Sequence, residues 1–76
     1  MATFSVTIVN QSFRASNDYD LGSLSDANRE ALKGALQIGA EEVINGKPFF
    51  GAEVMIEQGD TVLGRFIVWI GASHLQ

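Results

Sequence analysis

The stretch SLSDANREALKGALQIGAEEVING, residues 23–46, contains the one long helical pattern in this chain. Ser23 with Asp26 three residues later is a helix-start signal, because the serine hydroxyl can accept a hydrogen bond from a first-turn backbone N–H. Gly46 can adopt the left-handed conformation that ends a helix, and Pro48 prevents the helix from continuing. We therefore predict a helix over residues 24–45.

One side of this predicted helix is apolar and is built largely from small residues. The apolar positions are Leu24, Ala27, Ala31, Leu32, Ala35, Leu36, Ile38, Gly39 and Val43. Gly34 and Gly39 each cost roughly 1 kcal/mol of helix stability relative to alanine. A helix tolerates that cost when its backbone must approach another surface closely, so we predict that this helix lies tight against a sheet.

Alternating apolar and polar residues predict strands on both sides of the helix. We assign strands to residues 3–9, 49–57 and 61–70, with a turn at Gln58-Gly59-Asp60 and a tail over residues 71–76. Residues 13–19 are either a weak edge strand or an extended loop, because Ser16-Asn17-Asp18 is typical of loops. The fold class is therefore α+β: one long helix packed on a small, mainly antiparallel sheet of three or four strands, in a single domain. The strand over residues 3–9 lies beside either the strand over residues 49–57 or the last strand, over residues 61–70.

Pairing of the last two predicted strands follows from keeping both faces consistent. The expected opposite pairs are Glu57 with Thr61, Met55 with Leu63, Glu53 with Arg65, and Phe49 with Trp69. This register also places opposite charges against each other.

Composition limits the classes of function. The chain has 76 residues, of which 46% are hydrophobic, and a net charge of −4. Its basic residues are scattered, so direct nucleic-acid binding is not expected. It contains no cysteine, and it shows no secretory signal or apolar run long enough for a membrane span. We expect a cytoplasmic protein.

An apolar face remains on the last two strands after the helix has covered the other face. We expect it to consist of Phe49, Met55, Leu63, Ile67 and Trp69. A contiguous exposed apolar patch usually marks an interface. We therefore predict a homodimer that forms through this open face or through its edge strand; coverage by the chain's own termini and binding of another protein are the alternatives.

Residues with the chemistry of catalysis are few. Asp18 and Asp20 could form a carboxylate pair for a metal ion, but two loop carboxylates without further oxygen ligands are weak evidence, and a solvated loop is the simpler interpretation. His74 is the one histidine, and no serine has an evident base nearby. We predict a non-catalytic protein without a cofactor; a small enzyme or metal-binding protein that uses Asp18 and Asp20 is the alternative.

The segment LSDANREAL, residues 24–32, resembles a family of short bacterial proteins known as a domain of unknown function. Members share a strand, an acidic loop, a helix rich in Ala, Arg and Glu, and a hairpin that ends in an aromatic strand. The matching segments here are 18–20, 29–31, 50–53 and 58–60. The resemblance implies no catalytic residues.

The size, acidity and strand–helix–hairpin layout also resemble phage-encoded anti-CRISPR proteins, which inhibit CRISPR surveillance complexes and often occlude their nucleic-acid channel. This resemblance implies a protein or ribonucleoprotein partner with a basic surface. The candidate acidic contacts are Asp18, Asp20, Glu30, Glu41 and Glu42.

Overall fold

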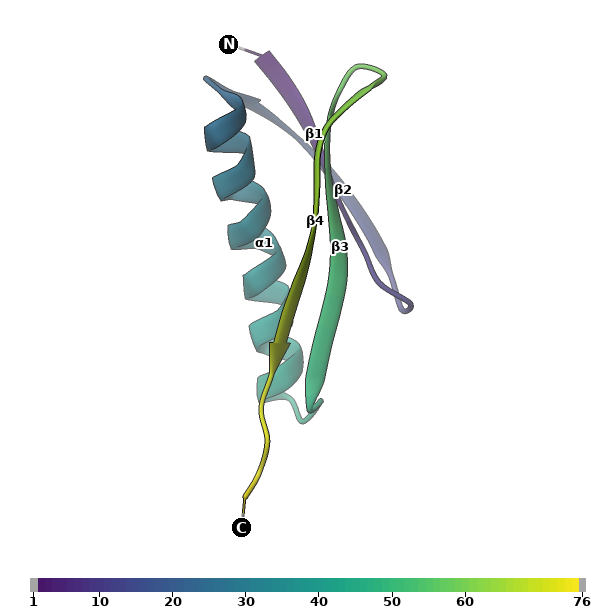
Figure 1. Cartoon of the computed structure of the whole chain (residues 1–76), viewed down its shortest axis with the longest axis vertical. Helices are drawn as coiled ribbons and strands as arrows, with labels where there is room; N and C mark the ends of the chain where they lie inside the picture. The colour runs from purple at the N-terminus through teal and green to yellow at the C-terminus, as the bar shows by residue number, and fades with distance from the viewer. Residues whose placement is uncertain (1, 76) are drawn as a thin grey trace.

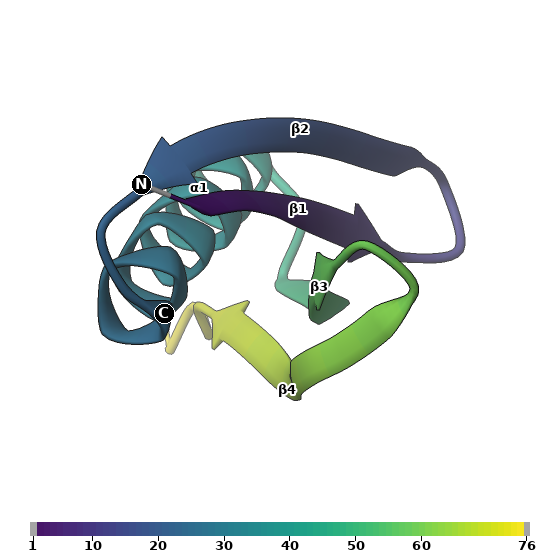
Figure 2. The same cartoon turned by 90° about the horizontal axis from the view of Figure 1, so that it is seen from above.

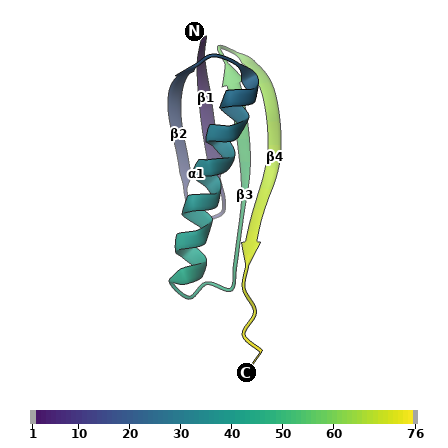
Figure 3. The same ribbon diagram turned by 90° about the vertical axis from the view of Figure 1, so that its left-hand side faces the viewer.

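A computed structural model describes residues 2–75 of the chain. The elements in chain order are β1 (Ala2–Val9), β2 (Arg14–Leu21), α1 (Leu24–Ile44), β3 (Phe49–Gln58) and β4 (Thr61–Gly71) (Figure 1). The strands form one antiparallel sheet in the order β2-β1-β3-β4, and α1 lies along one face of it (Figure 3). The predicted α+β class is confirmed, and β1 lies beside β3.

Local side-chain and backbone chemistry defines both ends of α1. Ser23 Oγ accepts a hydrogen bond from the Asp26 N–H at 3.2 Å, as the start signal predicted. At the other end, Gly46 has a φ of 109°, and its N–H donates to the Val43 carbonyl while the Lys47 N–H donates to the Glu42 carbonyl. These two bonds form a Schellman motif, which satisfies carbonyl groups that the last turn leaves open.

The face of α1 that meets the sheet is a row of small residues. Ala27, Ala31, Ala35 and Gly39 are its buried positions. The approach is closest at Gly39, where an added Cβ would lie 2.7 Å from Cδ2 of Phe50 and 2.8 Å from Cδ1 of Ile70. The predicted tight packing is therefore confirmed at Gly39, whereas a Cβ at Gly34 would make an ordinary contact of 3.8 Å with Ile8.

The larger apolar residues of α1 lie at the border of the sheet contact and are partly exposed. Leu24, Leu32 and Leu36 keep 38%, 40% and 44% of their surface exposed. We placed these leucines on the apolar side of the helix, but the sheet covers only the narrow arc of small residues. Leu32 and Leu36 follow Asn28 at four-residue steps, and the Asn28 side chain lies beside Gly64 of β4. Side chains four apart share a helix face, so both leucines lie on the flank of α1 next to β4.

Of residues 13–19, left open between strand and loop, all but Phe13 belong to a full strand, since β2 begins at Arg14. β2 pairs with β1 along its whole length, from Val9 opposite Arg14 to Ala2 opposite Leu21. The turn before β2 is closed by the Asn10 side chain, whose Oδ1 accepts from the N–H groups of Ser12 and Phe13. Hydrogen bonds between polar side chains of β1 and β2 compensate for the weak strand propensity of β2.

The β3–β4 register differs from the prediction. A two-residue turn at Gly59-Asp60 places Gln58 opposite Thr61, and further along Phe49 lies opposite Gly71 rather than Trp69. The turn shifts the pairing by one residue. A β-bulge then shifts it by one more, since Ile56 pairs with Gly64 and Glu57 with Val62, which leaves Leu63 without a partner on β3. The two shifts together restore the predicted faces from Gly64 onward.

The core lies between α1 and the sheet, which curves around the helix (Figure 2). Its largest contributors are Phe4, Val6, Ile8, Phe50, Val54, Ile56 and Val68. Phe13, in the β1–β2 loop, stacks on Phe50 with ring centroids 6.4 Å apart. Beyond β4, residues 72–75 of the predicted tail form no regular element, and residue 76 lies outside the described residues. In the part of the chain that is described, no helix combines the length and apolarity needed to cross a membrane.

Candidate interaction surface

The sheet face away from α1, here called the open face, has a polar half and an apolar half. On β1 and β2, three cross-strand hydrogen bonds of 2.7 Å join Thr3 to Asp20, Ser5 to Asp18, and Thr7 to Ser16. On β3 and β4, the same face carries the large apolar side chains Phe49, Met55, Ile67 and Trp69, together with the charged residues Glu53, Glu57 and Arg65. The open face is therefore chemically divided along the β1–β3 boundary.

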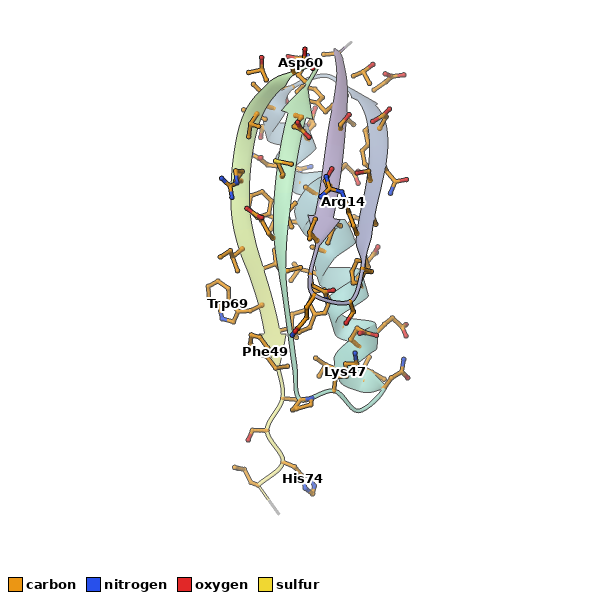
Figure 4. The ribbon with its side chains drawn as sticks, turned by 90° about the vertical axis from the view of Figure 1, so that its right-hand side faces the viewer. Arg14, Lys47, Phe49, Asp60, Trp69 and His74 are labelled. Carbon is orange, nitrogen blue, oxygen red and sulfur yellow. The ribbon has the colours of Figure 1, made fainter. Side chains whose placement is uncertain are left out.

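Phe49, Ile67 and Trp69 form an exposed cluster on the apolar half, called here the aromatic cluster. They expose 60%, 67% and 67% of their surface, and Figure 4 shows Phe49 and Trp69 near each other at one end of the hairpin. Gly51 leaves space that the Phe49 ring occupies, since a Cβ on Gly51 would lie 3.0 Å from Cε2 of that ring, whereas a Cβ on Gly71 would make an ordinary contact of 3.6 Å with it. In this cluster the large Phe49 side chain therefore lies over Gly51.

An ion pair borders the aromatic cluster on the side of the turn. The Nε and Nη2 atoms of Arg65 both donate to Oε2 of Glu53, with the Nε bond at 2.9 Å. We predicted these residues as directly opposite, but the observed register makes them diagonal neighbours, with Glu53 opposite Ile67 and Arg65 opposite Met55. The opposite charges of Arg65 and Glu53 are therefore paired. A shallow depression lined by Glu53, Arg65, Phe66 and Ile67 adjoins the pair.

The other two predicted interface residues behave differently. Met55 lies on the open face but is half-buried, between Thr7 and Arg65 on the neighbouring strands. Leu63 is half-buried and packs against the core. Because of the bulge, Val62 occupies the open-face position that we expected for Leu63. Val62 lies opposite Glu57 and keeps 47% of its surface exposed. We therefore correct the surface by replacing Leu63 with Val62.

The five predicted acidic contacts do not gather at one place. Asp18 and Asp20 lie on the open face of β2, where each accepts a hydrogen bond from a hydroxyl group of β1. Glu30, Glu41 and Glu42 lie on α1, on the opposite side of the sheet. Glu42 also pairs with Lys47 at 3.2 Å. A single basic surface could therefore contact only one of these two groups.

Candidate catalytic or metal-binding groups are dispersed. Within residues 2–75, no three His, Asp or Glu side chains lie close enough together to hold a metal ion. His74 lines a hollow with Val43, Pro48 and Ala72.

The sequence analysis placed Leu32 and Leu36 on the apolar side of the helix but did not predict that they would stay exposed. Leu32 and Leu36 keep 40% and 44% of their surface exposed on the flank of α1 next to β4, on the opposite side of the sheet from the aromatic cluster. Their signal was the width of the apolar arc, which exceeds what one narrow sheet covers.

Scans of known family models, of curated proteins and of solved structures each found no match to this chain. The resemblances described above therefore rest on the quoted residues and layout alone.

Proposed function

We propose that this protein is a non-catalytic interaction module that works as a homodimer, with the β3–β4 hairpin as its contact surface. The aromatic cluster is the observation that supports this function. Aromatic residues are enriched in interfaces and dominate their binding energy, whereas a monomer gains nothing from holding a tryptophan and a phenylalanine in water.

The exposed area of the cluster supports an interface rather than incidental exposure. With about 200 Å² for a fully exposed side chain of this size, the exposed fractions of Phe49, Ile67 and Trp69 amount to roughly 400 Å². That matches the largest apolar patch of a typical monomer, which is often functional, and is about half of the ~800 Å² that each partner buries in a standard interface. Neighbouring surface on β4 must therefore supply the remainder.

Light scattering after size exclusion tests this proposal. The wild type is expected to elute with twice its chain mass of 8.2 kDa, and Trp69→Lys as a folded monomer. The matched control is Ile44→Lys, which adds the same charge at an apolar residue that is 77% exposed at the end of α1; this variant should remain dimeric. A monomeric wild type at about 100 µM, far above the Kd of a stable dimer, would refute the proposal.

The competing function is a small enzyme or metal-binding protein that uses Asp18 and Asp20. A metal bound only by the folded state would raise the melting temperature, so a thermal-shift titration with divalent cations separates this function from the first. A rise in the wild type that disappears in Asp18→Asn with Asp20→Asn would support the metal site instead.

The narrower expectation of a phage-type inhibitor remains a proposal within the interaction class. Its acidic contacts would have to come either from Asp18 and Asp20 or from the glutamates of α1. Charge reversal of each group separately, followed by binding to a CRISPR ribonucleoprotein, tests it: loss of binding in one group alone is the expected result.

A further inference from the structure

The two edges of the sheet differ in what they offer to another strand. β2 carries three charged side chains, Arg14, Asp18 and Asp20, within eight residues. β4 is longer, with eleven residues, and Arg65 is its one charged residue. Charged side chains on an edge oppose pairing with other strands, whereas a long apolar edge favours it. Figure 3 shows β4 at the margin of the sheet, to one side of α1.

The register identifies which backbone groups of β4 are free. The Ala72 N–H donates to the Pro48 carbonyl at 3.0 Å, and this pair continues the register that places Phe49 opposite Gly71. Hydrogen-bonded pairs alternate with non-bonded pairs along an antiparallel ladder. The N–H and C=O groups of Arg65, Ile67 and Trp69 therefore point away from β3, to the free edge.

We propose that the dimer forms by antiparallel pairing of β4 with β4 of a second copy, which joins the two sheets into one. This inference rests on the proposed homodimer and specifies its geometry. A two-fold axis perpendicular to the sheet places the open faces of both copies on the same side. The two aromatic clusters then lie next to each other across the seam, and the Leu32 and Leu36 flanks of the two helices face the seam on the other side.

Charge and the bulge at Leu63 disfavour two registers of this pairing. An axis at Arg65 would oppose two like charges, which destabilises a strand pair. An axis at Phe66 would extend the ladder into the bulge at Leu63. An axis at Ile67 places each Arg65 opposite Trp69 of the second copy, where the guanidinium can contact the indole ring. That register forms about six backbone hydrogen bonds from the free groups of Arg65, Ile67 and Trp69.

Net charge favours a second copy at this edge over any other edge-to-edge arrangement. Each copy carries −4, so two copies repel each other over most of their surfaces. β4 contains no acidic residue, and the nearby Glu53 is neutralised by Arg65. Of the two edge strands, β4 is thus the less acidic, because β2 carries Asp18 and Asp20.

Amide hydrogen exchange followed by NMR tests the pairing in the wild-type chain. When light scattering reports a dimer, the amides of Arg65, Ile67 and Trp69 should be protected at least tenfold more than at a dilution where the protein is monomeric. The outward amides of β2 serve as the control and should not change. A dimer whose β4 amides stay unprotected overturns edge pairing but leaves the homodimer standing; a monomeric wild type overturns both.

Cysteine cross-linking tests the register, since the chain contains no other cysteine. In the proposed register the Cα atoms of the two Ile67 residues are about 5.5 Å apart, within disulfide range. Ile67→Cys should therefore form a disulfide-linked dimer on mild oxidation, and Ser16→Cys, exposed on the β2 edge, should not. Failure of Ile67→Cys to cross-link in a sample that is dimeric and β4-protected would overturn the register.

Discussion

Alanine substitutions at Gly34 and Gly39 are expected to change the stability of the protein in opposite directions. Both positions lie inside α1, so both gain roughly 1 kcal/mol of helix propensity when glycine becomes alanine. At Gly34 the new Cβ meets Cδ1 of Ile8 at 3.8 Å, an ordinary van der Waals contact. At Gly39 it would lie 2.7 Å from the ring of Phe50 and 2.8 Å from Ile70, which forces the neighbours to move.

The size of the Gly39 effect depends on which neighbour can move. Cδ1 of Ile70 is the end of a flexible side chain and can rotate away. The Phe50 ring is 3% exposed and stacks on Phe13, so its shift disturbs the core. Overpacking of this kind costs about 1–3 kcal/mol. We expect Gly34→Ala to stabilise by up to about 1 kcal/mol, and Gly39→Ala to be neutral or destabilising by up to about 2 kcal/mol.

Chemical and thermal unfolding followed by circular dichroism, at one fixed protein concentration, measures both variants. The propensity gain is common to the two, so their difference isolates the steric cost at Gly39. Each kcal/mol corresponds to about 4–8 °C in Tm for a domain of this size. If Gly39→Ala proves as stable as Gly34→Ala, the close approach of α1 to Phe50 is wrong.

Three further predictions concern the helix ends and the exposed ion pair. Ser23→Ala removes the cap bond to the Asp26 N–H and should lower the unfolding free energy by about 1 kcal/mol, with Ser25→Ala as an exposed control that a urea melt should leave within about 0.5 kcal/mol of wild type. Gly46→Ala places a Cβ at a φ of 109° and should cost at least about 1 kcal/mol in the same melt, an effect absent if the helix end can relax. A double-mutant cycle on Arg65 and Glu53 should give a coupling of about 0.2–1 kcal/mol that falls with added salt, and a salt-independent coupling would contradict a solvent-screened pair.

The helix could be predicted from sequence because its limits are set by residues next to each other in the chain. Ser23 and Asp26 define its start, and Gly46 defines its end through backbone bonds only a few residues long. The predicted end at residue 45 differs from Ile44 by one position. Which apolar residues the helix buries was harder to predict, since Leu32 and Leu36 depend on the width of a sheet assembled from distant segments.

Strand pairing depends on partners that are remote in the chain, and there the predictions were less complete. The β2 segment lacks strand propensity, and its order comes from β1, whose Ser5 and Thr3 bond to Asp18 and Asp20. The turn at Gly59-Asp60 and the bulge at Leu63 each shift the pairing by one residue, so the predicted register was wrong, and the bulge, which has no local signal, left Leu63 assigned to the wrong face. Phe49, Ile67 and Trp69 were placed correctly, because alternation within one strand is a local property.

The unequal edges of the sheet also bear on how large an assembly this chain can build. A strand edge that pairs head-to-tail with a different edge can add copies without end, and such growth leads to fibres. If β4 pairs with its own counterpart, both apolar edges are consumed in a single event, and the joined sheet ends on each side at β2. The carboxylates of Asp18 and Asp20 on β2 then oppose the addition of further strands, so association stops at two copies.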